Sequence, residues 1–216
     1  MTDAPRKGDV FPMKPSRLIA SALLLAAAAT LAPGRMSAQS APVAKVQALC
    51  DALISAMRLG PEVGFAGRRQ LLEPEIRRAL DLPLMTRLVL GPPWRTLTPD
   101  LQRQLVEAFS DYSISTYANR FNGYSGEQFS VDPAPARLES GDVIVHTRLA
   151  TKDPDPVKLD YLMRANGGDW KIIDVYLSGT ISELAARRSE FTSVLRQGGP
   201  AALVAMLKKK AADLSG

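Results

Sequence analysis

The residues that most often carry acid–base or nucleophilic chemistry are sparse in this sequence. His146 is the only histidine and Cys50 the only cysteine in a chain of 216 residues. His146 could act as a general base, or it could lie at the surface or at the edge of a groove. A Ser–His–Asp triad would need His146 as its base, and no G-x-S-x-G motif surrounds a serine. A zinc site would have to be built mainly from carboxylates, and no spacing typical of metal ligands occurs.

Asp174 is the acidic residue that interrupts the largely apolar run Trp170–Leu177. A carboxylate among apolar side chains could serve as a general base, because desolvation favours its neutral form. Alternatively, Asp174 forms an ion pair with a base such as Arg148, Arg164 or Arg188. The second interpretation gives the carboxylate a structural role and leaves the chain without a catalytic group.

Basic residues near the C-terminus offer a second kind of site. Arg187, Arg188 and Lys208–Lys210 could bind an anionic head group or an acidic partner, or they could form a solvated helix face. The formal net charge is +5, of which residues 1–38 contribute +3, so the remainder is nearly neutral. The sequence has no long basic stripe, no P-loop and no G-x-G-x-x-G motif. We therefore expect neither a nucleic-acid partner nor a cofactor.

Aromatic residues spread over the second half of the chain could line a cavity for acyl chains. They are Phe109, Tyr112, Tyr117, Phe121, Phe129 and Tyr161. Sites for lipids and small molecules are mostly apolar concavities, so a hollow core and a filled core have the same sequence pattern. Both interpretations stay open at this point.

The N-terminus has the features of an export signal. Basic residues including Lys14 precede the apolar run Leu18–Ala32, which is too short for a typical membrane span. Small residues follow, and cleavage is expected near Ala38. We predict a signal peptide over residues 1–38, with Met13 as an alternative start and an uncleaved anchor as the competing interpretation.

Helical patterns and their capping residues dominate the first half of the remaining chain. Pro42 begins an apolar stripe that is expected to end near Gly60. Asp81 and Thr98 are predicted N-caps of the two helices that follow them. The predicted helices are 42–60, 74–80, 82–90, 99–121, 181–197 and a last one from Pro200.

From Glu127 the hydrophobic period changes to two, which is typical of strands. The predicted strands are Phe129–Val131, Arg137–Glu139, Val143–Ala150, Val157–Met163 and Trp170–Leu177. A turn at Asn166–Asp169 joins the last two, and the last is apolar on both faces, as in a strand that is covered on both sides. The element order predicts an α+β domain in which helices pack on one antiparallel sheet of about four strands.

Several short motifs, weak individually, follow one another in order along most of the chain. They are Leu88-Val89-Leu90-Gly91 with Trp94, Phe109 with Tyr117-Ala118, Tyr124-Ser125-Gly126, Trp170-Lys171-Ile172-Ile173-Asp174-Val175, Gly179 with Arg188-Ser189-Glu190-Phe191, and Gly198-Gly199 with Leu203 and Leu207. In this order and spacing they resemble the motifs of the MlaC (toluene-tolerance auxiliary) family over roughly Val43–Leu214. The segment Thr180–Leu184 is one residue longer than the family pattern, which resembles the hopanoid-associated branch called HpnM.

The resemblance implies a periplasmic lipid carrier that performs no chemistry. Its domain would cover residues 42–214, and a twisted sheet and its helices would enclose an apolar cavity for the acyl tails of a phospholipid or a hopanoid-type lipid. The head group would stay near the mouth. The residues expected to contact lipid are Leu84, Leu88, Phe109, Tyr112, Tyr117, Phe121, Phe129, Val145, Leu149, Leu159, Tyr161, Met163 and Ile172.

The same resemblance implies transient contact with membrane complexes that exchange lipid and maintain outer-membrane lipid asymmetry. These would be an MCE-domain ABC transporter complex or an RND-type hopanoid exporter, and an outer-membrane lipoprotein–porin complex. Two alternatives remain beside this interpretation. One is a small cone-shaped α+β enzyme with Asp174 as general base, and the other is an envelope scaffold that binds a partner through its basic C-terminal helices without cargo.

Overall fold

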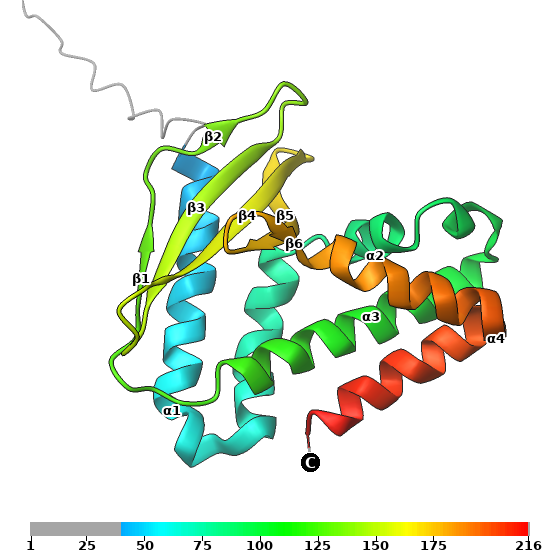
Figure 1. Ribbon diagram of the computed structural model, residues 1–216, viewed down its shortest axis with the longest axis horizontal. Coiled ribbons are helices and arrows are strands. Elements are labelled where there is room, and N and C mark those ends of the chain that lie inside the picture. The colour runs from blue at the N-terminus through cyan, green and yellow to red at the C-terminus, as the bar shows by residue number, and fades with distance from the viewer. Residues whose placement is uncertain (1–39, 216) are drawn as a thin grey trace, which may run out of the picture. The chain divides into compact units, whose positions relative to one another are not determined.

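The computed structural model describes residues 40–215 (Figure 1). Its helices are α1 (Ser40–Ala79), α2 (Leu82–Leu90), the 3-10 turn η1 (Pro92–Thr96), α3 (Pro99–Arg120) and α4 (Glu183–Asp213). Its strands are β1 (Gln128–Val131), β2 (Ala136–Arg137), β3 (Val143–Ala150), β4 (Val157–Asn166), β5 (Asp169–Leu177) and β6 (Ile181–Ser182). The predicted signal peptide, residues 1–38, lies outside the described residues. Within the described part of the chain, no helix has the length and apolar character needed to cross a membrane.

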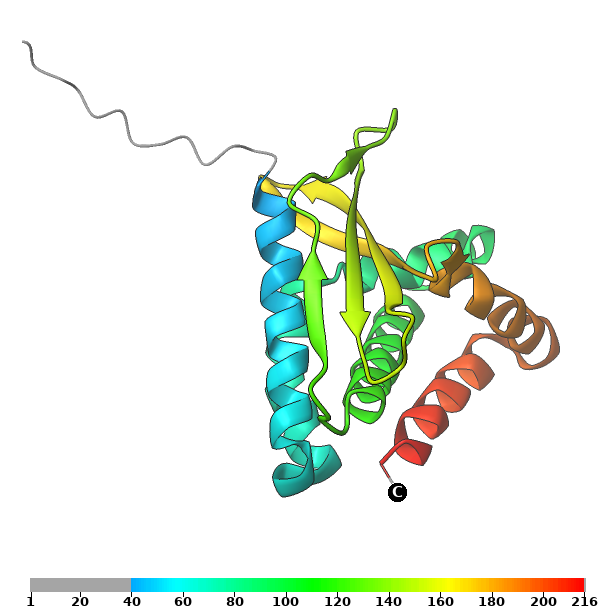
Figure 2. The same cartoon turned by 60° about the vertical axis from the view of Figure 1, so that its left-hand side comes forward.

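The strands form one antiparallel sheet in the order β1-β3-β4-β5-β6, and β2 pairs with β3. Four strands are long, whereas β2 and β6 have two residues each. The long first part of α1 packs along the sheet, and α3 and α4 lie side by side (Figures 1 and 2). The predicted α+β class, with helices packed on one antiparallel sheet, is confirmed.

Burial along the strands follows the predicted alternation. On β3 the residues Val143, Val145, Thr147 and Leu149 are buried, and their neighbours are more exposed. On β5 four consecutive residues from Ile172 to Val175 are buried, as expected for a strand covered on both faces. A bulge accommodates Ile173, because Met163 pairs with Ile172 whereas Leu162 pairs with Asp174.

In α1 and in α4 a glycine with non-helical φ and ψ divides the helical region into two helices, as the sequence predicted for Gly198–Gly199. The helix from Pro42 continues past Gly60 and breaks at Gly64, where φ is 61°. The predicted helix 74–80 belongs to its second part. Likewise α4 breaks at Gly199, where φ is 72°, and its second part turns back (Figures 1 and 2). Residues with a side chain rarely adopt these φ values, whereas glycine does so freely.

The start of α4 also differs from the prediction. Ile181 was expected to begin the helix, but Ile181 and Ser182 form β6, which pairs with the end of β5. The helix begins at Glu183, and the Ser182 hydroxyl accepts a hydrogen bond from the Ala185 N–H at 2.9 Å. The predicted N-caps Asp81 and Thr98 are confirmed, since their side chains accept hydrogen bonds from Leu84 N and Leu101 N.

A buried arginine connects the two parts of α1 to α3. Arg68 donates from Nε to the Ala118 carbonyl at 2.8 Å and from Nη1 to the Gly60 carbonyl at 3.1 Å. Ala118 lies in the last turn of α3, and Gly60 lies just before the break in α1. The carbonyls at these helix ends carry partial negative charge, so they stabilise a guanidinium that has lost much of its water.

The ion pair between Asp142 and Arg164 fastens the start of β3 to the end of β4. Arg164 donates to both carboxylate oxygens, at 2.8 and 2.7 Å, and Asp142 is buried. These hydrogen bonds hold the pKa of Asp142 below its ordinary value of 3.8. A lowered pKa in the folded state stabilises the fold above that ordinary value, and this contribution is lost as the pH falls through the folded-state pKa.

We therefore expect Asp142→Asn to lower the free energy of unfolding by about 1–2 kcal/mol at neutral pH. The difference from the wild type should shrink as the pH falls below the ordinary value of 3.8. Urea unfolding of both proteins across this pH range measures it, with Asp155→Asn in an exposed turn as the control. A difference that stays constant with pH would contradict the assignment.

Candidate functional site

A cavity of about 400 Å³ lies between the inner face of the sheet and the helices. Side chains from α1, α2, α3, β3, β4, β5 and α4 contribute to its wall. Most of them are apolar: Met57, Leu80, Met85, Tyr117, Phe121, Leu149, Val157, Leu159, Tyr161, Val175, Leu177 and Leu184. The break in α1 helps to form this wall, because the second part of the helix returns to the sheet and Leu80 forms a bridge with Ile172.

Polar side chains of α3 line one side of the cavity. Ser113, Thr116 and Arg120 lie three and four residues apart, so they share one helix face. The Thr116 hydroxyl donates to the Tyr112 carbonyl at 2.7 Å. The Ser113 hydroxyl is buried, and no residue between 40 and 215 forms a hydrogen bond with it. A buried hydroxyl without a partner at a cavity wall is a group that a ligand atom or a water could satisfy.

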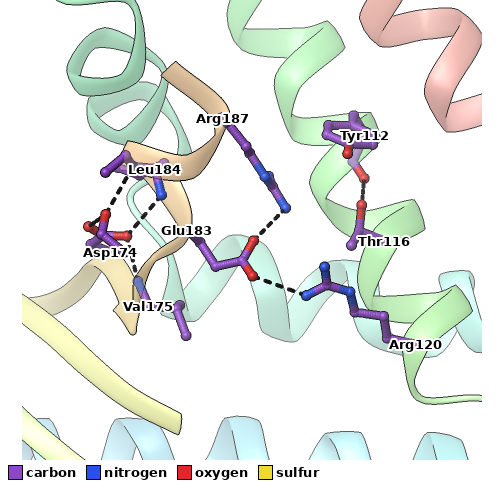
Figure 3. A network of polar contacts seen from close by, with 10 residues as sticks. Tyr112, Thr116, Arg120, Asp174, Val175, Glu183, Leu184 and Arg187 are labelled. Atoms are coloured by element: carbon purple, nitrogen blue, oxygen red, sulfur yellow. Dashed lines mark hydrogen bonds and ion pairs between the residues drawn. The ribbon is translucent and has the colours of Figure 1, made fainter. Parts of the chain in front are cut away.

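A network of charged residues lies where the first turns of α4 meet α3 (Figure 3). Glu183 forms ion pairs through Oε1 with Arg120, at 3.3 Å, and through Oε2 with Arg187, at 3.2 Å. The Arg187 guanidinium also lies over the Tyr112 ring, 5.0 Å from its centroid. All three charged residues line the cavity. The site therefore combines an apolar interior with a charged margin.

Two tyrosines of the cavity wall keep their hydroxyl protons at ordinary pH. Burial raises the pKa of Tyr117 to about 12, and it raises the pKa of Tyr161 well above 10.0. The Cys50 thiol lies close to Tyr161, and burial together with the charge of Asp51 raises its pKa to about 12. The wall therefore presents neutral hydroxyl groups, and the thiol beside Tyr161 is not a reactive nucleophile.

The structure brings together some of the residues that were predicted to contact lipid. Tyr117, Phe121, Leu149, Leu159 and Tyr161 line the cavity. Val145, Met163 and Ile172 are buried in the core of the sheet and helices. Their contact with lipid stays a prediction in every case.

The remaining predicted residues lie away from the cavity wall. Phe109 packs edge-to-face on Phe191 with ring centroids 6.3 Å apart, and Phe129 packs against Phe121 at 6.4 Å. Tyr112 lies beneath Arg187, and Leu84 lines a separate, more polar groove. Leu88 packs against the core, and its carbonyl accepts a hydrogen bond from Arg188.

Sequence reasoning missed the polar members of the wall. Glu183 and Arg120 are separated by 63 residues, and neither stands out in the sequence. One signal was available for Arg120, which follows Ser113 and Thr116 at helical spacing on the stripe of α3. Arg187 was considered as an anion-binding residue, but its pairing with Glu183 was not predicted.

Asp174 has neither of its predicted roles. It accepts hydrogen bonds from Ser182 Oγ, from Leu184 N at 3.3 Å and from Val175 N at 2.8 Å (Figure 3). The predicted arginine pair is wrong: among residues 40–215, no arginine forms an ion pair with Asp174. The general-base role is not supported, because Asp174 pairs with Leu162 on the face opposite to Tyr161 and lies outside the cavity wall.

The other chemical candidates also lie apart from the cavity. His146 Nδ1 lies 2.9 Å from Asp160 Oδ2, and the His146 side chain is 42% exposed. Arg188 donates to the Leu88 carbonyl, and Lys210 pairs with Glu190. Within the described part of the chain, no cluster of three or more His, Cys, Asp or Glu side chains is placed to hold a metal ion.

Comparisons with known proteins agree with this geometry. Residues 47–209 match the family described as MlaC protein. A solved structure of a phospholipid-binding protein from Ralstonia solanacearum, in complex with a phospholipid, has a similar fold. Its TM-score is 0.70 at 24% sequence identity, over 81% of this chain and 99% of that one.

We expect Asp174→Ala to destabilise the protein, because it removes the acceptor for the first turn of α4. The free energy of unfolding should fall by about 2–4 kcal/mol. Urea unfolding measures the change. The control is Asp100→Ala, an exposed acid in the first turn of α3, for which we expect a loss below about 1 kcal/mol. Equal losses in the two variants would contradict the capping role.

Cys50 should resist alkylation in the folded protein. Its thiol is fully buried and its pKa is raised to about 12, so very little thiolate is present at about pH 8. Mass spectrometry after treatment with iodoacetamide should find the native protein unmodified and the urea-unfolded protein fully modified. Rapid labelling of the native protein would show that this part of the core opens to solvent.

Proposed function

Because this chain belongs to the MlaC family, we propose that it is a periplasmic carrier that binds acyl chains of a phospholipid in the described cavity. The observation that carries this proposal is the amphipathic character of the cavity itself. Most of its lining is apolar, and three of its four charged residues, Arg120, Glu183 and Arg187, are paired with one another. A lipid has the same division between apolar chains and a polar head group.

The size of the cavity bears on how much of a lipid it would hold. A cavity of about 150 Å³ holds benzene, which corresponds to about 25 Å³ per carbon. At that ratio, a cavity of about 400 Å³ would hold about 16 carbons, or one acyl chain. A second acyl chain would need a larger cavity.

One buried chain supplies enough free energy for a carrier. Each methylene removed from water contributes about 0.8 kcal/mol, so a chain of about 16 carbons contributes roughly 12 kcal/mol before the cost of ordering it. This would retain a lipid during passage through an aqueous compartment. The phospholipid named for the Ralstonia solanacearum protein of similar fold supports the same ligand class.

The size also favours an acyl chain over a hopanoid in this cavity. A pentacyclic hopanoid is rigid and wider than a single acyl chain, so it needs more room than one acyl chain does. The hopanoid-associated branch suggested by Thr180–Leu184 is therefore the second candidate for the cargo. Offering both lipids to the protein and weighing the complexes by native mass spectrometry distinguishes them.

The cellular setting is part of the proposal. We assign the lipid-binding domain to residues 42–214 and propose that residues 1–38 direct export to the periplasm. The carrier would exchange lipid by transient contact with an MCE-domain transporter, or with an RND-type exporter if the cargo is a hopanoid, and with an outer-membrane lipoprotein–porin complex. Transfer between vesicles separates a carrier from an envelope scaffold, which would bind partners without moving lipid.

We expect Leu177→Trp to lower lipid loading at least five-fold. Leu177 lies at the end of β5, is half-buried and lines the cavity. A larger side chain there would fill space that the acyl chain of the lipid needs. The fraction of protein carrying lipid after incubation with phospholipid vesicles is measured by native mass spectrometry.

The matched control is Leu71→Trp on α1, where the side chain is 44% exposed and lies outside the cavity wall. Its loading should equal that of the wild type. If the wild type takes up no lipid from vesicles, the proposed function is wrong.

A further inference from the structure

The charges around the cavity are balanced. Arg120 and Arg187 are basic, and Glu127 and Glu183 are acidic. Among residues 40–215, no other charged side chain lines the cavity. A wall with two charges of each sign does not attract a net anion, but it can bind a group that carries both signs.

The two acids have different partners. Glu127 accepts a hydrogen bond from the backbone N–H of Ser125 in its own turn, which lowers its pKa. Glu183 instead uses one oxygen for Arg120 and the other for Arg187. The side chains of Glu183 and Arg187 are only 16% exposed. Glu183 is thus the acid that neutralises both guanidinium groups.

A phosphate would compete with Glu183 for these arginines. Guanidinium groups bind phosphate oxygens with the same paired geometry that they use for carboxylates. A phosphate held between Arg120 and Arg187 would leave Glu183 partly buried without a basic partner, which is costly. A positive group attached to that phosphate would supply the missing partner.

Ser113 provides a second, independent indication that polar ligand atoms reach this side of the cavity. Its buried hydroxyl has no hydrogen-bond partner among residues 40–215, and it lies two turns from Arg120 on the same face of α3. Two turns correspond to about 10 Å along the helix. An oxygen at the junction between head group and chain could accept a hydrogen bond from it.

We propose that Glu183 sets the head-group selectivity of this cavity, favouring a phospholipid whose phosphate carries a primary ammonium over one whose head group is a net anion. This inference rests on the proposed function, because it concerns the same cavity and the same class of ligand. Arg120 and Arg187 hold the phosphate, and Glu183 moves from the guanidinium groups to the ammonium.

The test uses vesicles with equal amounts of phosphatidylethanolamine and phosphatidylglycerol. After incubation and removal of the vesicles, mass spectrometry measures the ratio of the two lipids bound to the protein. The wild type should be enriched in phosphatidylethanolamine. In Glu183→Gln the ratio should shift about ten-fold toward phosphatidylglycerol, which corresponds to about 1.4 kcal/mol.

A variant that removes a positive charge from the cavity wall, in place of the negative charge of Glu183, provides a second test. Arg120 is 54% exposed, so Arg120→Gln should fold normally, and it leaves an excess of acid in the cavity wall. Its ratio should move toward phosphatidylethanolamine. Arg103→Gln removes an exposed arginine of α3 that pairs with Asp100, and its ratio should match the wild type.

The outcomes separate this inference from the proposed function. If the wild type loads no lipid, the proposed function fails. If it loads lipid without preference, or if the ratio is unchanged in Glu183→Gln while circular dichroism shows that the variant is folded, the assignment of Glu183 is wrong.

Discussion

The hydrogen bonds of Asp174 fix the start of α4 to β5, and the cavity wall depends on this connection. This buried carboxylate on β5 accepts from Ser182 Oγ and from the backbone of Leu184, at the point where the chain enters α4. A negative charge at a helix N-terminus is favoured by the free N–H groups and by the helix dipole. Because the first turn of α4 is fixed to the sheet in this way, Glu183 and Leu184 become part of the cavity wall.

The rest of the wall comes from segments that turn back toward the sheet. The break at Gly64 returns α1 to β5, and the break at Gly199 lets the second part of α4 turn back (Figures 1 and 2). Arg68 secures the first of these turns by binding carbonyls near two helix ends. The two turns bring apolar surface together around the cavity, and Arg68 supplies hydrogen bonds to the Gly60 and Ala118 carbonyls.

Local features of the sequence predicted most of the elements. Interactions within a few residues account for the helix caps Asp81 and Thr98 and for the alternating burial along Val143–Ala150. The apolar composition of β5 likewise predicted that both of its faces are covered. The break in α4 before the helix from Pro200 was also predicted, whereas in α1 the helix resumes after Gly64, ahead of the predicted start at Pro74, because a glycine by itself does not show where a helix resumes. The two-residue strand β6 was missed because its pairing with β5 is a tertiary contact, and two residues are too few to show a strand pattern in the sequence.

By itself, the sequence determined the class of the fold, the apolar stripes and the scarcity of catalytic groups. Only the tertiary structure decided which apolar residues enclose a cavity. Tyr117 and Phe109 both belong to apolar positions of α3, yet Tyr117 lines the cavity and Phe109 packs against Phe191. The tertiary structure also decided that Glu183 bridges Arg120 and Arg187. Periodicity reports which face of an element is apolar, whereas the packing of distant segments sets what that face meets.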